Sequence, residues 1–399
     1  MMLSPRRIVH YYFGLKMRGC VARQHPMMAP SLLRSINTTR VVEIDPLLDG
    51  RWDEFVESHP RATVHHLGAW ATILASCYRY GPRYIALEVD GGLAGVLPLV
   101  SSGLRLSGSR LSSLPTAKAA GPLALSAQHE RTLLTAALEI KRREGLSSMT
   151  VRSQSSGLEG GGSAQIEDVS STQVLELNCS PEELLDGYKR ASVNLYRNIL
   201  KSKKSGLVVE ETKSDRELRE WYRLYLLTIR RHRTLPRRLK QLREARARLG
   251  AHWRLVTVKK DGAVIAGGVF HDIAGTVELM YNASDPGTLS LRPNHALYWH
   301  MITDSITRER VGFDFGVSNH ETLERFKRQW GTTQHGVYVY GDPGTGEEGQ
   351  SDPALAQSAR ALSGRTRLAA RAKSLAGDAL AMFPLTVNRA IGSVAYRIM

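Results

Sequence analysis

Two ionisable side chains that lie close together in the sequence could do chemistry. The stretch 311–340 reads VGFDFGVSNHETLERFKRQWGTTQHGVYVY and predicts a buried strand at 311–315, a helix at about 320–330 and a last strand at 336–340. Asp314 lies inside the apolar strand, and Lys327 shares one helix face with Trp330. Burying a carboxylate or an ammonium alone is costly, so both positions need an explanation.

A fixed cation such as Lys327 could stabilise an oxyanion that develops on a carbonyl under attack by a nucleophile. Asp314 would position Lys327 or accept a proton. Structural interpretations stay open: Lys327 pairs with Glu324 or Asp314 only to satisfy its charge, and Asp314 bonds its own turn at 315–316.

The order of motifs in this region resembles the C-terminal signature of the Fem-type aminoacyltransferases. These motifs are Asp-Phe-Gly at 314–316, Phe-Lys-x-x-Trp-Gly at 326–331 and a closing aromatic strand. The chain looks most like the shorter FemAB-like proteins with a BioF2-like acetyltransferase domain, which belong to the GNAT-like acyltransferase superfamily. The resemblance covers about residues 40–342 and includes the segments 65–70, 90–99, 114–122, 281–284 and 291–299.

The resemblance implies roles for several side chains. Phe326-Lys327 looks like the Phe-Lys pair that contacts the donor ester in the Fem enzymes, which would make Lys327 and Asp314 the catalytic residues. The expected substrate-binding residues are Tyr281, Arg292, Asn294, Phe326 and Trp330. The spacing of Phe326 and Trp330 also suits packing in a core, and Arg292 and Asn294 also suit a solvated helix cap.

No metal and no bound cofactor are implied, and the donor substrate is left as acyl-CoA or aminoacyl-tRNA. In GNAT enzymes a Gly-rich loop holds the coenzyme A pyrophosphate at the start of a helix. The corresponding loop, 290–295, reads SLRPNH without that pattern, and its proline removes one backbone donor. This departure weakens the case for acyl-CoA.

An internal repeat predicts the domain organisation. Apolar strands joined at Asp90-Gly91 and again at Asp261-Gly262 indicate two hairpins, each with an Ala-Gly pair early in its second strand. We therefore expect an α+β fold of two tandem GNAT-like modules with mixed sheets flanked by helices. The expected boundaries are a basic, disordered extension at 1–40, a first module at 41–152, a Ser/Gly-rich linker at 153–172, a catalytic second module at 173–342, and a linker with an amphipathic basic tail at 343–399.

The net charge of +16 is concentrated at the two ends. Residues 1–40 hold seven Lys/Arg and no acid, and residues 350–399 hold seven Lys/Arg and two acids, so the central body is nearly balanced. Within the body, the expected basic helix at 188–204 and the basic run at 230–248 could contact tRNA or a pyrophosphate-linked lipid, although such runs are usually solvated helix faces. The tails could contact an anionic membrane at its periphery, or the C-terminal helix could dock on the protein itself.

Composition limits the remaining classes. Three distant cysteines fit neither a disulfide framework nor a metal site, and no apolar run reaches the length of a membrane span, so a cytoplasmic protein is expected, with contact at the inner membrane face left open. The predicted function is transfer of an acyl or aminoacyl group to an amine of a cell-envelope or polysaccharide precursor. Two alternatives stay open: an acetyl-CoA-dependent N-acetyltransferase in exopolysaccharide or lipid synthesis, and a non-catalytic scaffold at the membrane.

Overall fold

A computed structural model describes residues 38–341, except 79, 103–108, 115–116, 159–163, 233 and 319–320. The expected N-terminal extension and C-terminal amphipathic tail therefore lie almost wholly outside the described residues. The elements of the first half are β1 (Thr39–Glu43), α1 (Arg51–Ser58), η1 (Val64–His66), α2 (Ala69–Tyr78), β2 (Gly81–Val89), β3 (Gly92–Ser102), β4 (Arg110–Ser113), β5 (Leu123–Ala124), α3 (Ala127–Arg143) and β6 (Ser148–Ser153).

The second half begins with a strand in the segment that was expected to be a linker. Its elements are β7 (Gln165–Glu176), α4 (Pro181–Ala191), α5 (Val193–Lys204), β8 (Val208–Thr212), α6 (Asp215–Arg231), α7 (Leu239–Leu249), η2 (Gly250–His252), β9 (Trp253–Lys260), β10 (Ala263–Ile273), β11 (Thr276–Ser284), η3 (Pro286–Leu291), α8 (Pro293–Thr307), β12 (Gly312–Val317), α9 (Glu321–Arg328) and β13 (Thr333–Gly341).

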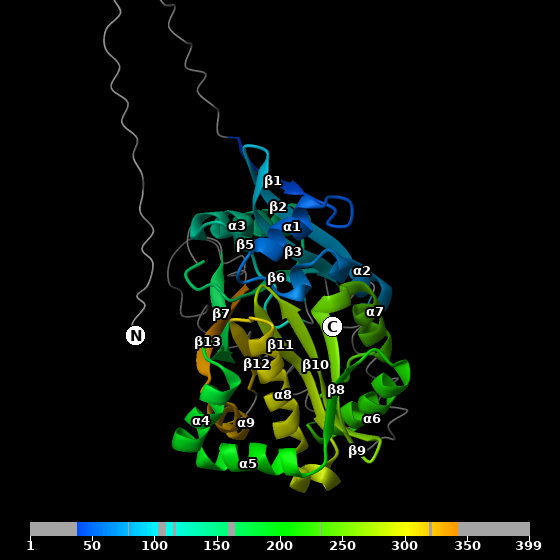
Figure 1. Cartoon of the computed structure of the whole chain (residues 1–399). Coiled ribbons are helices and arrows are strands. Elements are labelled where there is room, and N and C mark those ends of the chain that lie inside the picture. Colours follow the sequence, from blue (N-terminus) through cyan, green and yellow to red (C-terminus); the bar gives the residue numbers. More distant parts are fainter. Residues whose placement is uncertain are drawn as a thin grey trace, which may run out of the picture. The chain divides into compact units, whose positions relative to one another are not determined.

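The two halves repeat one pattern and share one sheet. Among the described residues the strand order is β1-β2-β3-β4-β6-β13-β7-β12-β11-β10-β9-β8, with β5 beside β3 (Figure 1). In each half a hairpin is followed by an antiparallel strand, a crossover helix (α3 or α8) and a parallel strand (β6 or β12). The predicted tandem α+β modules are confirmed, but they join into one mixed sheet because β7 and β13 pair with each other between them.

The strand β7 corrects the prediction of a linker at 153–172. Its Ser- and Thr-rich sequence has little apolar alternation, yet it forms ladders with β12 on one side and with β13 on the other. Strand β13, from the second half, pairs in turn with β6 of the first. Two neighbours satisfy the backbone groups of β7, so tertiary pairing overrides its weak local preference.

The hairpins form as predicted. Asp90-Gly91 and Asp261-Gly262 all have positive φ, between 50° and 84°, as a tight two-residue turn requires. The register slips early in both second strands, at Ala94 of the first Ala-Gly pair in β3 and at Ile265, just before the second pair, in β10. At Gly267 a Cβ would lie 2.6 Å from the carbonyl oxygen of Val256, so the close approach of the two strands requires glycine there.

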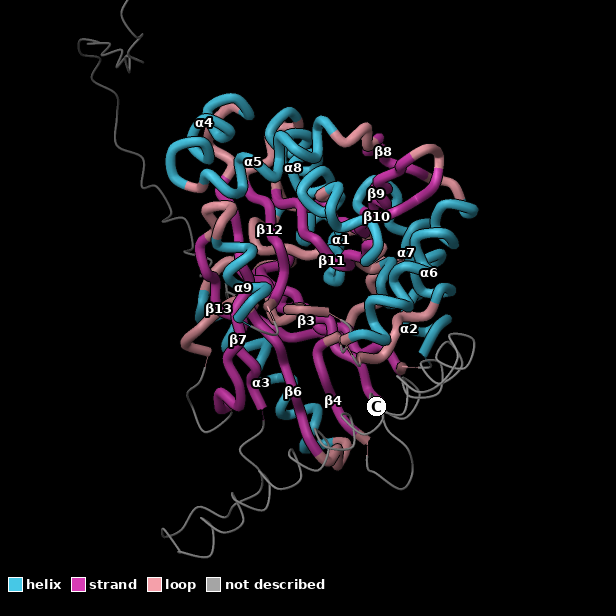
Figure 2. The backbone as a smooth tube through the Cα atoms, turned by 90° about the horizontal axis from the view of Figure 1, so that it is seen from below, coloured by secondary structure: helices cyan, strands magenta, loops and turns pink. Residues whose placement is uncertain are grey.

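The helices lie around the strands of the sheet (Figure 2). Three clusters of buried side chains hold them against it. Alternate residues of a strand face opposite sides, and in β10 Val269 packs with α1, α2, α6 and α7 while Phe270 packs with α5 and α8. The helix α3 covers strands of the first half. The predicted single helix at 188–204 is wrong: Ser192, with φ −141° and ψ 63°, separates α4 from α5.

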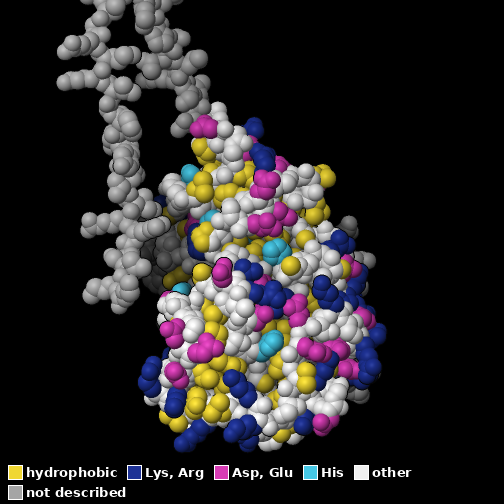
Figure 3. Space-filling model, in the orientation of Figure 1, with side chains coloured by type: hydrophobic (Ala, Val, Ile, Leu, Met, Phe, Trp, Pro, Cys, Tyr) yellow, Lys and Arg dark blue, Asp and Glu magenta, His cyan; other side chains and the backbone are white. Residues whose placement is uncertain are grey.

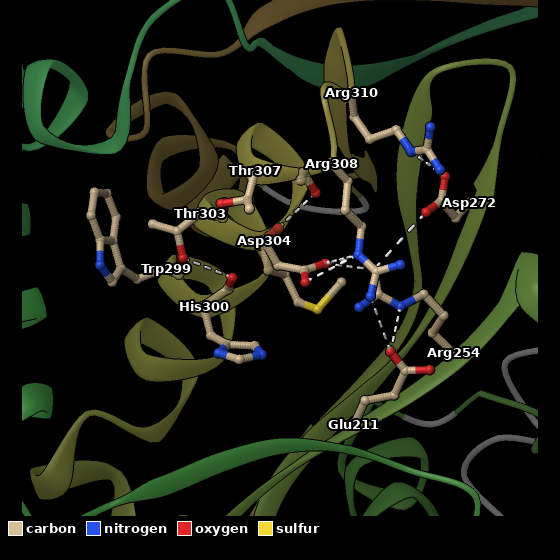
Figure 4. A network of polar contacts seen from close by, with 12 residues as sticks. Glu211, Arg254, Asp272, Trp299, His300, Thr303, Asp304, Thr307, Arg308 and Arg310 are labelled. Atoms are coloured by element: carbon tan, nitrogen blue, oxygen red, sulfur yellow. Dashed lines mark hydrogen bonds and ion pairs between the residues drawn. The ribbon is translucent and has the colours of Figure 1, made fainter.

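A buried ion network anchors α8 to the sheet (Figure 4). The Arg254 side chain on β9 is 4% exposed, and it donates to Glu211 of β8 at 2.8 Å and to Asp304 of α8 at 2.7 Å. Just beyond α8, Arg310 pairs with Asp272 of β10 at 2.8 Å. A buried guanidinium with several carboxylate partners fixes geometry, and α8 leads directly into β12, so the network sets where β12 begins.

Candidate active site

The parallel pair β11 and β12 frames the candidate site. Its ladder has three aligned pairs, of which Glu278 and Asp314 are the last. Beyond them β11 continues beside β10 as far as Ser284, whereas Val317 of β12 pairs with β7. Gly316 has a φ of +74°, and a Cβ there would lie 3.1 Å from the carbonyl oxygen of Leu279. The ladder therefore ends where β12 makes a glycine-dependent turn.

Lys327 reaches this turn from α9. Its side chain is 3% exposed, and its Nζ donates to the carbonyl oxygens of Gly316 at 2.7 Å and Val317 at 2.9 Å. Burial lowers the pKa of Lys327 to about 8, while the charge of Asp314 acts in the opposite direction. The predicted structural alternative of a pair with Glu324 does not form, because Glu324 binds Arg328. The ammonium is thus fixed at the end of β12.

Asp314 is buried and accepts hydrogen bonds from three groups. These are the Lys118 ammonium, the Thr172 hydroxyl and the backbone N–H of Gly316, the last at 2.7 Å. The bond to Gly316 is the turn interaction that the sequence left open. In the described contacts Asp314 and Lys327 do not bind each other directly, but both bind Gly316. Asp314 accepts from its backbone N–H, and Lys327 donates to its carbonyl oxygen.

Sequence reasoning missed Lys118 and Glu278. Lys118, from the connection between β4 and β5, lies 2.8 Å from Glu278 and also binds Asp314. Burial raises the pKa of the Glu278 carboxyl, an effect that Lys118 opposes and Asp314 reinforces. Burial alone would lower the pKa of Lys118, but the two carboxylates outweigh it and raise that pKa. The sequence did contain a signal for Glu278: like Asp314, it is an acidic residue inside an otherwise apolar strand, TVELM at 276–280.

The expected substrate-binding residues fall into two groups. Tyr281 packs on the α6 side of the sheet, with its ring 5.6 Å from that of Tyr225. Asn294, at the start of α8, shares hydrogen bonds with Asn282 and Ser284, each at 3.3 Å. The structure therefore separates Tyr281 from Asn294, although the sequence placed them in one cleft.

Arg292 and the aromatic residues bind protein groups. Arg292 has a left-handed backbone conformation (φ 64°) and donates to Asn198 of α5 at 2.8 Å. Trp330 is fully buried, and its carbonyl accepts from Tyr188 at 2.9 Å. Phe326 packs between the rings of His295 and Tyr298. Trp330 thus lies in the core and Phe326, which is partly buried, packs against it, as their spacing also allowed.

A wide groove of about 760 Å³ lies beside α9, and Lys327 is not among its lining residues. It is formed by parts of β7, α4, α9 and the start of β13, and Trp330 is among its lining residues. Figure 3 shows apolar side chains gathered on the lower left of this face, with Lys and Arg side chains around them. The groove neighbours the fixed ammonium without exposing it.

The expected basic surface is partly used for internal contacts. In α7, Arg243 and Arg246 bind Asp215, Arg248 binds Glu244, and Lys240 donates to the carbonyl of Ser76. In the described part of the chain, no helix combines the length and apolarity needed to span a bilayer. Nor do the described residues include a cluster of three side chains suited to a metal ion.

Comparisons with known proteins agree with this geometry. Residues 189–328 match the family model of the acetyltransferase (GNAT) domain. This segment of the chain runs from the end of α4 to the end of α9. No curated protein matches the chain.

Solved structures share the fold. That of FemX is 17% identical, with a TM-score of 0.61, over 75% of this chain and 96% of that one. L-PGS from Bacillus licheniformis is 14% identical, with a TM-score of 0.50, over 75% and 92%. The C-terminal domain of a putative lysylphosphatidylglycerol synthetase from Agrobacterium fabrum is 13% identical, with a TM-score of 0.50, over 73% and 90%. Residues 189–328 therefore match a GNAT acetyltransferase domain, and the chain shares its fold with FemX.

Proposed function

We propose that this chain transfers an acyl or aminoacyl group to an amine of a cell-envelope or polysaccharide precursor. The observation that supports this most is the buried ammonium of Lys327, fixed where the β11–β12 ladder ends, inside the segment that matches the GNAT domain. A cation held there needs no reorganisation when negative charge develops on a substrate, which is the condition for electrostatic stabilisation of a transition state.

The geometry leaves one donor of Lys327 for substrate. An ammonium has three N–H donors, and within the described residues two of them bind Gly316 and Val317. The third would bind the oxyanion that forms when the amine nitrogen attacks the donor carbonyl. Collapse of that intermediate breaks the carbon–oxygen or carbon–sulfur bond of the donor. The alkoxide or thiolate that leaves takes the proton that the attacking nitrogen loses, so the products are an amide and an alcohol or thiol.

Asp314 acts as a positioning residue in this proposal. Its carboxylate holds the N–H of Gly316, and the carbonyl of the same residue binds Lys327. Loss of Asp314 would therefore free the turn that orients the ammonium. Thr172 and Lys118 also bind Asp314, so its carboxylate is committed to structure rather than to a proton from substrate.

The acceptor class is proposed from the similar structures. The fold is that of FemX and of a putative lysylphosphatidylglycerol synthetase, and the latter name describes synthesis of an aminoacylated lipid. An envelope precursor that carries an amine is the corresponding acceptor for this chain. Contact with tRNA through α5 or with an anionic membrane belongs to the same proposal.

The donor separates two versions of the function. The matched family is described as an acetyltransferase, which favours acetyl-CoA. The start of α8 favours an aminoacyl donor, because Arg292 binds Asn198 and Pro293 has no N–H for a pyrophosphate. Retention of the purified chain on immobilised acetyl-CoA, with release by free acetyl-CoA, would establish the N-acetyltransferase. No retention, together with aminoacyl transfer from charged tRNA, would establish the other version.

The test in cells is mass spectrometry of envelope intermediates from a deletion strain. We expect an intermediate that lacks one acyl or aminoacyl mass, restored by the wild-type gene and not by Lys327→Ala. Unchanged intermediates would contradict the proposed acceptor. Full complementation by a Lys327→Ala/Asp314→Ala double variant would indicate a non-catalytic scaffold instead.

A further inference from the structure

The carboxylates of Glu278 and Asp314 form a charged cluster whose partner comes from the other half of the chain. They are aligned across the parallel ladder, so both side chains lie on the same face of the sheet. Lys118 binds both. The three side chains are 10% exposed or less. One ammonium between two carboxylates leaves the cluster with a formal charge of −1.

An uncompensated buried charge needs a partner, since taking it out of water costs several kcal/mol. Asp314 has three hydrogen-bond donors, whereas Glu278 has only Lys118 in the described contacts. Burial and the charge of Asp314 accordingly raise the pKa of Glu278. Either a proton or an external cation would neutralise the cluster, and Glu278 is the side that can accept it.

A pocket of about 190 Å³ adjoins the cluster. The first half lines it with residues 60–63, Lys118 and Gln154, and the second half lines it with residues of β7, β10, β11, β12 and β13. Its other cation, Arg61, binds Glu130 and Ser155. Pro60 and His335 at its edge are exposed, so the pocket opens to solvent.

A second observation points to a ligand in this pocket. His271, which lines it, is 3% exposed, and in the described structure its Nδ1 has no hydrogen-bond partner. The ring centroid of His65 lies 5.5 Å from that of His271, and the Nε2 of His65 also has no hydrogen-bond partner in the described structure. Burial lowers the pKa of His271 to about 3, so its ring is neutral. A buried polar nitrogen without a partner costs about 1–3 kcal/mol, which a bound polar group would recover.

We propose that this pocket binds an alkylammonium group, held by Glu278 beside Lys118 and Asp314, with His271 contacting the polar part of the ligand. Such a ligand brings the charge of the cluster from −1 to zero. Asp314, which lines the pocket, precedes by two residues Gly316, whose carbonyl oxygen binds Lys327. If the proposed function holds, it is the subsite that binds the amine acceptor in its charged form, and Glu278 would take the proton that the nitrogen must lose before it attacks.

The test is titration calorimetry of the full chain with n-butylammonium, with n-butanol as the neutral probe of the same shape. We expect saturable binding of the cation only, at least tenfold weaker in Glu278→Gln. The matched control is Asp304→Asn, which removes a partly buried carboxylate of the Arg254 network away from the pocket, and it should keep the wild-type affinity.

A second measurement does not depend on the folding of any carboxylate variant. In the wild-type chain, n-butylammonium should shift the ring nitrogen resonances of His271, assigned by their loss in His271→Gln, and n-butanol should not. The proposal is overturned if n-butylammonium does not bind, if it binds Glu278→Gln equally well, or if His271 does not respond. Neither binding experiment contains an acyl donor, so it tests the pocket alone. If the cation binds but the chain has no transferase activity, the proposed function is contradicted and the proposed pocket is not.

Discussion

The two halves of the sheet contain the same junction with different side chains. In the first half β4 and β6 align three parallel pairs, ending with Ser112 and Thr150. In the second half β11 and β12 also align three, ending with Glu278 and Asp314. The middle pair is apolar and buried in both halves. A repeated backbone has therefore received ionisable groups at one of its two junctions.

The comparison shows what each half supplies. The second half holds the carboxylates, the glycine turn and the ammonium of Lys327. The first half supplies Lys118 and part of the wall of the small pocket. Most ionisable groups of the candidate site thus lie in one repeat, while the other supplies Lys118 from the β4–β5 connection.

The largest expected effect concerns the second half alone. Lys327→Ala should lower the transfer rate by about 10²–10³-fold, as loss of a preorganised donor does. The matched control is Lys259→Ala, which removes a lysine paired with Glu210 and Glu217 at the edge of the sheet. Single-turnover rates of the folded fractions check this, and equal rates in the two variants would remove Lys327 from the mechanism.

A second prediction concerns the contact between the halves. Lys118→Ala should destabilise the fold by about 3–5 kcal/mol, because two buried carboxylates lose their cation. The measurement is urea unfolding, and Lys240→Ala, an exposed lysine bonded to the Ser76 carbonyl, should change stability by less than about 0.5 kcal/mol.

The same variant should show a defined pH dependence. The pKa of Glu278 is raised in the folded state, so the folded protein binds this proton more tightly than the unfolded chain does. The resulting contribution to stability is complete below the pKa of the unfolded state and is lost as pH rises through the pKa of the folded state. Without Lys118 that pKa rises further. The loss of stability in Lys118→Ala should therefore be larger at pH 8 than at pH 5, and the reverse order would contradict the assigned charges.

A third prediction distinguishes the two buried lysines by their titration. Lys327, with a pKa of about 8, loses its proton above that pH, whereas the pKa of Lys118 is raised. With saturating substrates the transfer rate at pH 9 should be about one tenth of its maximum. A rate that keeps rising beyond pH 9 would show that no charged Lys327 is needed.

The smallest effect tests the equivalence of the repeats. Gly91→Ala and Gly262→Ala should each cost about 1 kcal/mol, because both glycines have φ near +80° and an added Cβ meets no atom within 4 Å. Gly50, equally uncrowded and with a φ of −61°, is the control and should tolerate alanine. Clearly unequal losses of stability in the Gly91→Ala and Gly262→Ala variants, measured by thermal unfolding, would contradict the equivalence of the two hairpins.

Local signals in the sequence predicted local structure well. The Asp-Gly turns form as expected at both hairpins. The break at Ser192 was missed because no glycine or proline marks it; α5 turns there to pack against α8. Strand β7 was missed because its partners lie far away in the sequence.

The site was predictable only in part, for the same reason. Asp314 and Lys327 stood out as charges within apolar patterns, and the structure buries both. Their partners were not visible: Lys118 is 160 residues from Glu278, and the carbonyls that bind Lys327 have no sequence signature. Pairings across the sheet arise from the topology, which the repeat suggested but did not specify.

The most direct test of the central claim is amide formation by the purified full chain. It would be incubated with n-butylamine and either labelled acetyl-CoA or charged tRNA, and the products identified by mass spectrometry. We predict an N-acylated amine with one of the two donors, which Lys327→Ala fails to produce at a comparable rate. Absence of any amide with both donors, from a folded wild-type chain, would contradict the claim that this repeat is an acyltransferase centre.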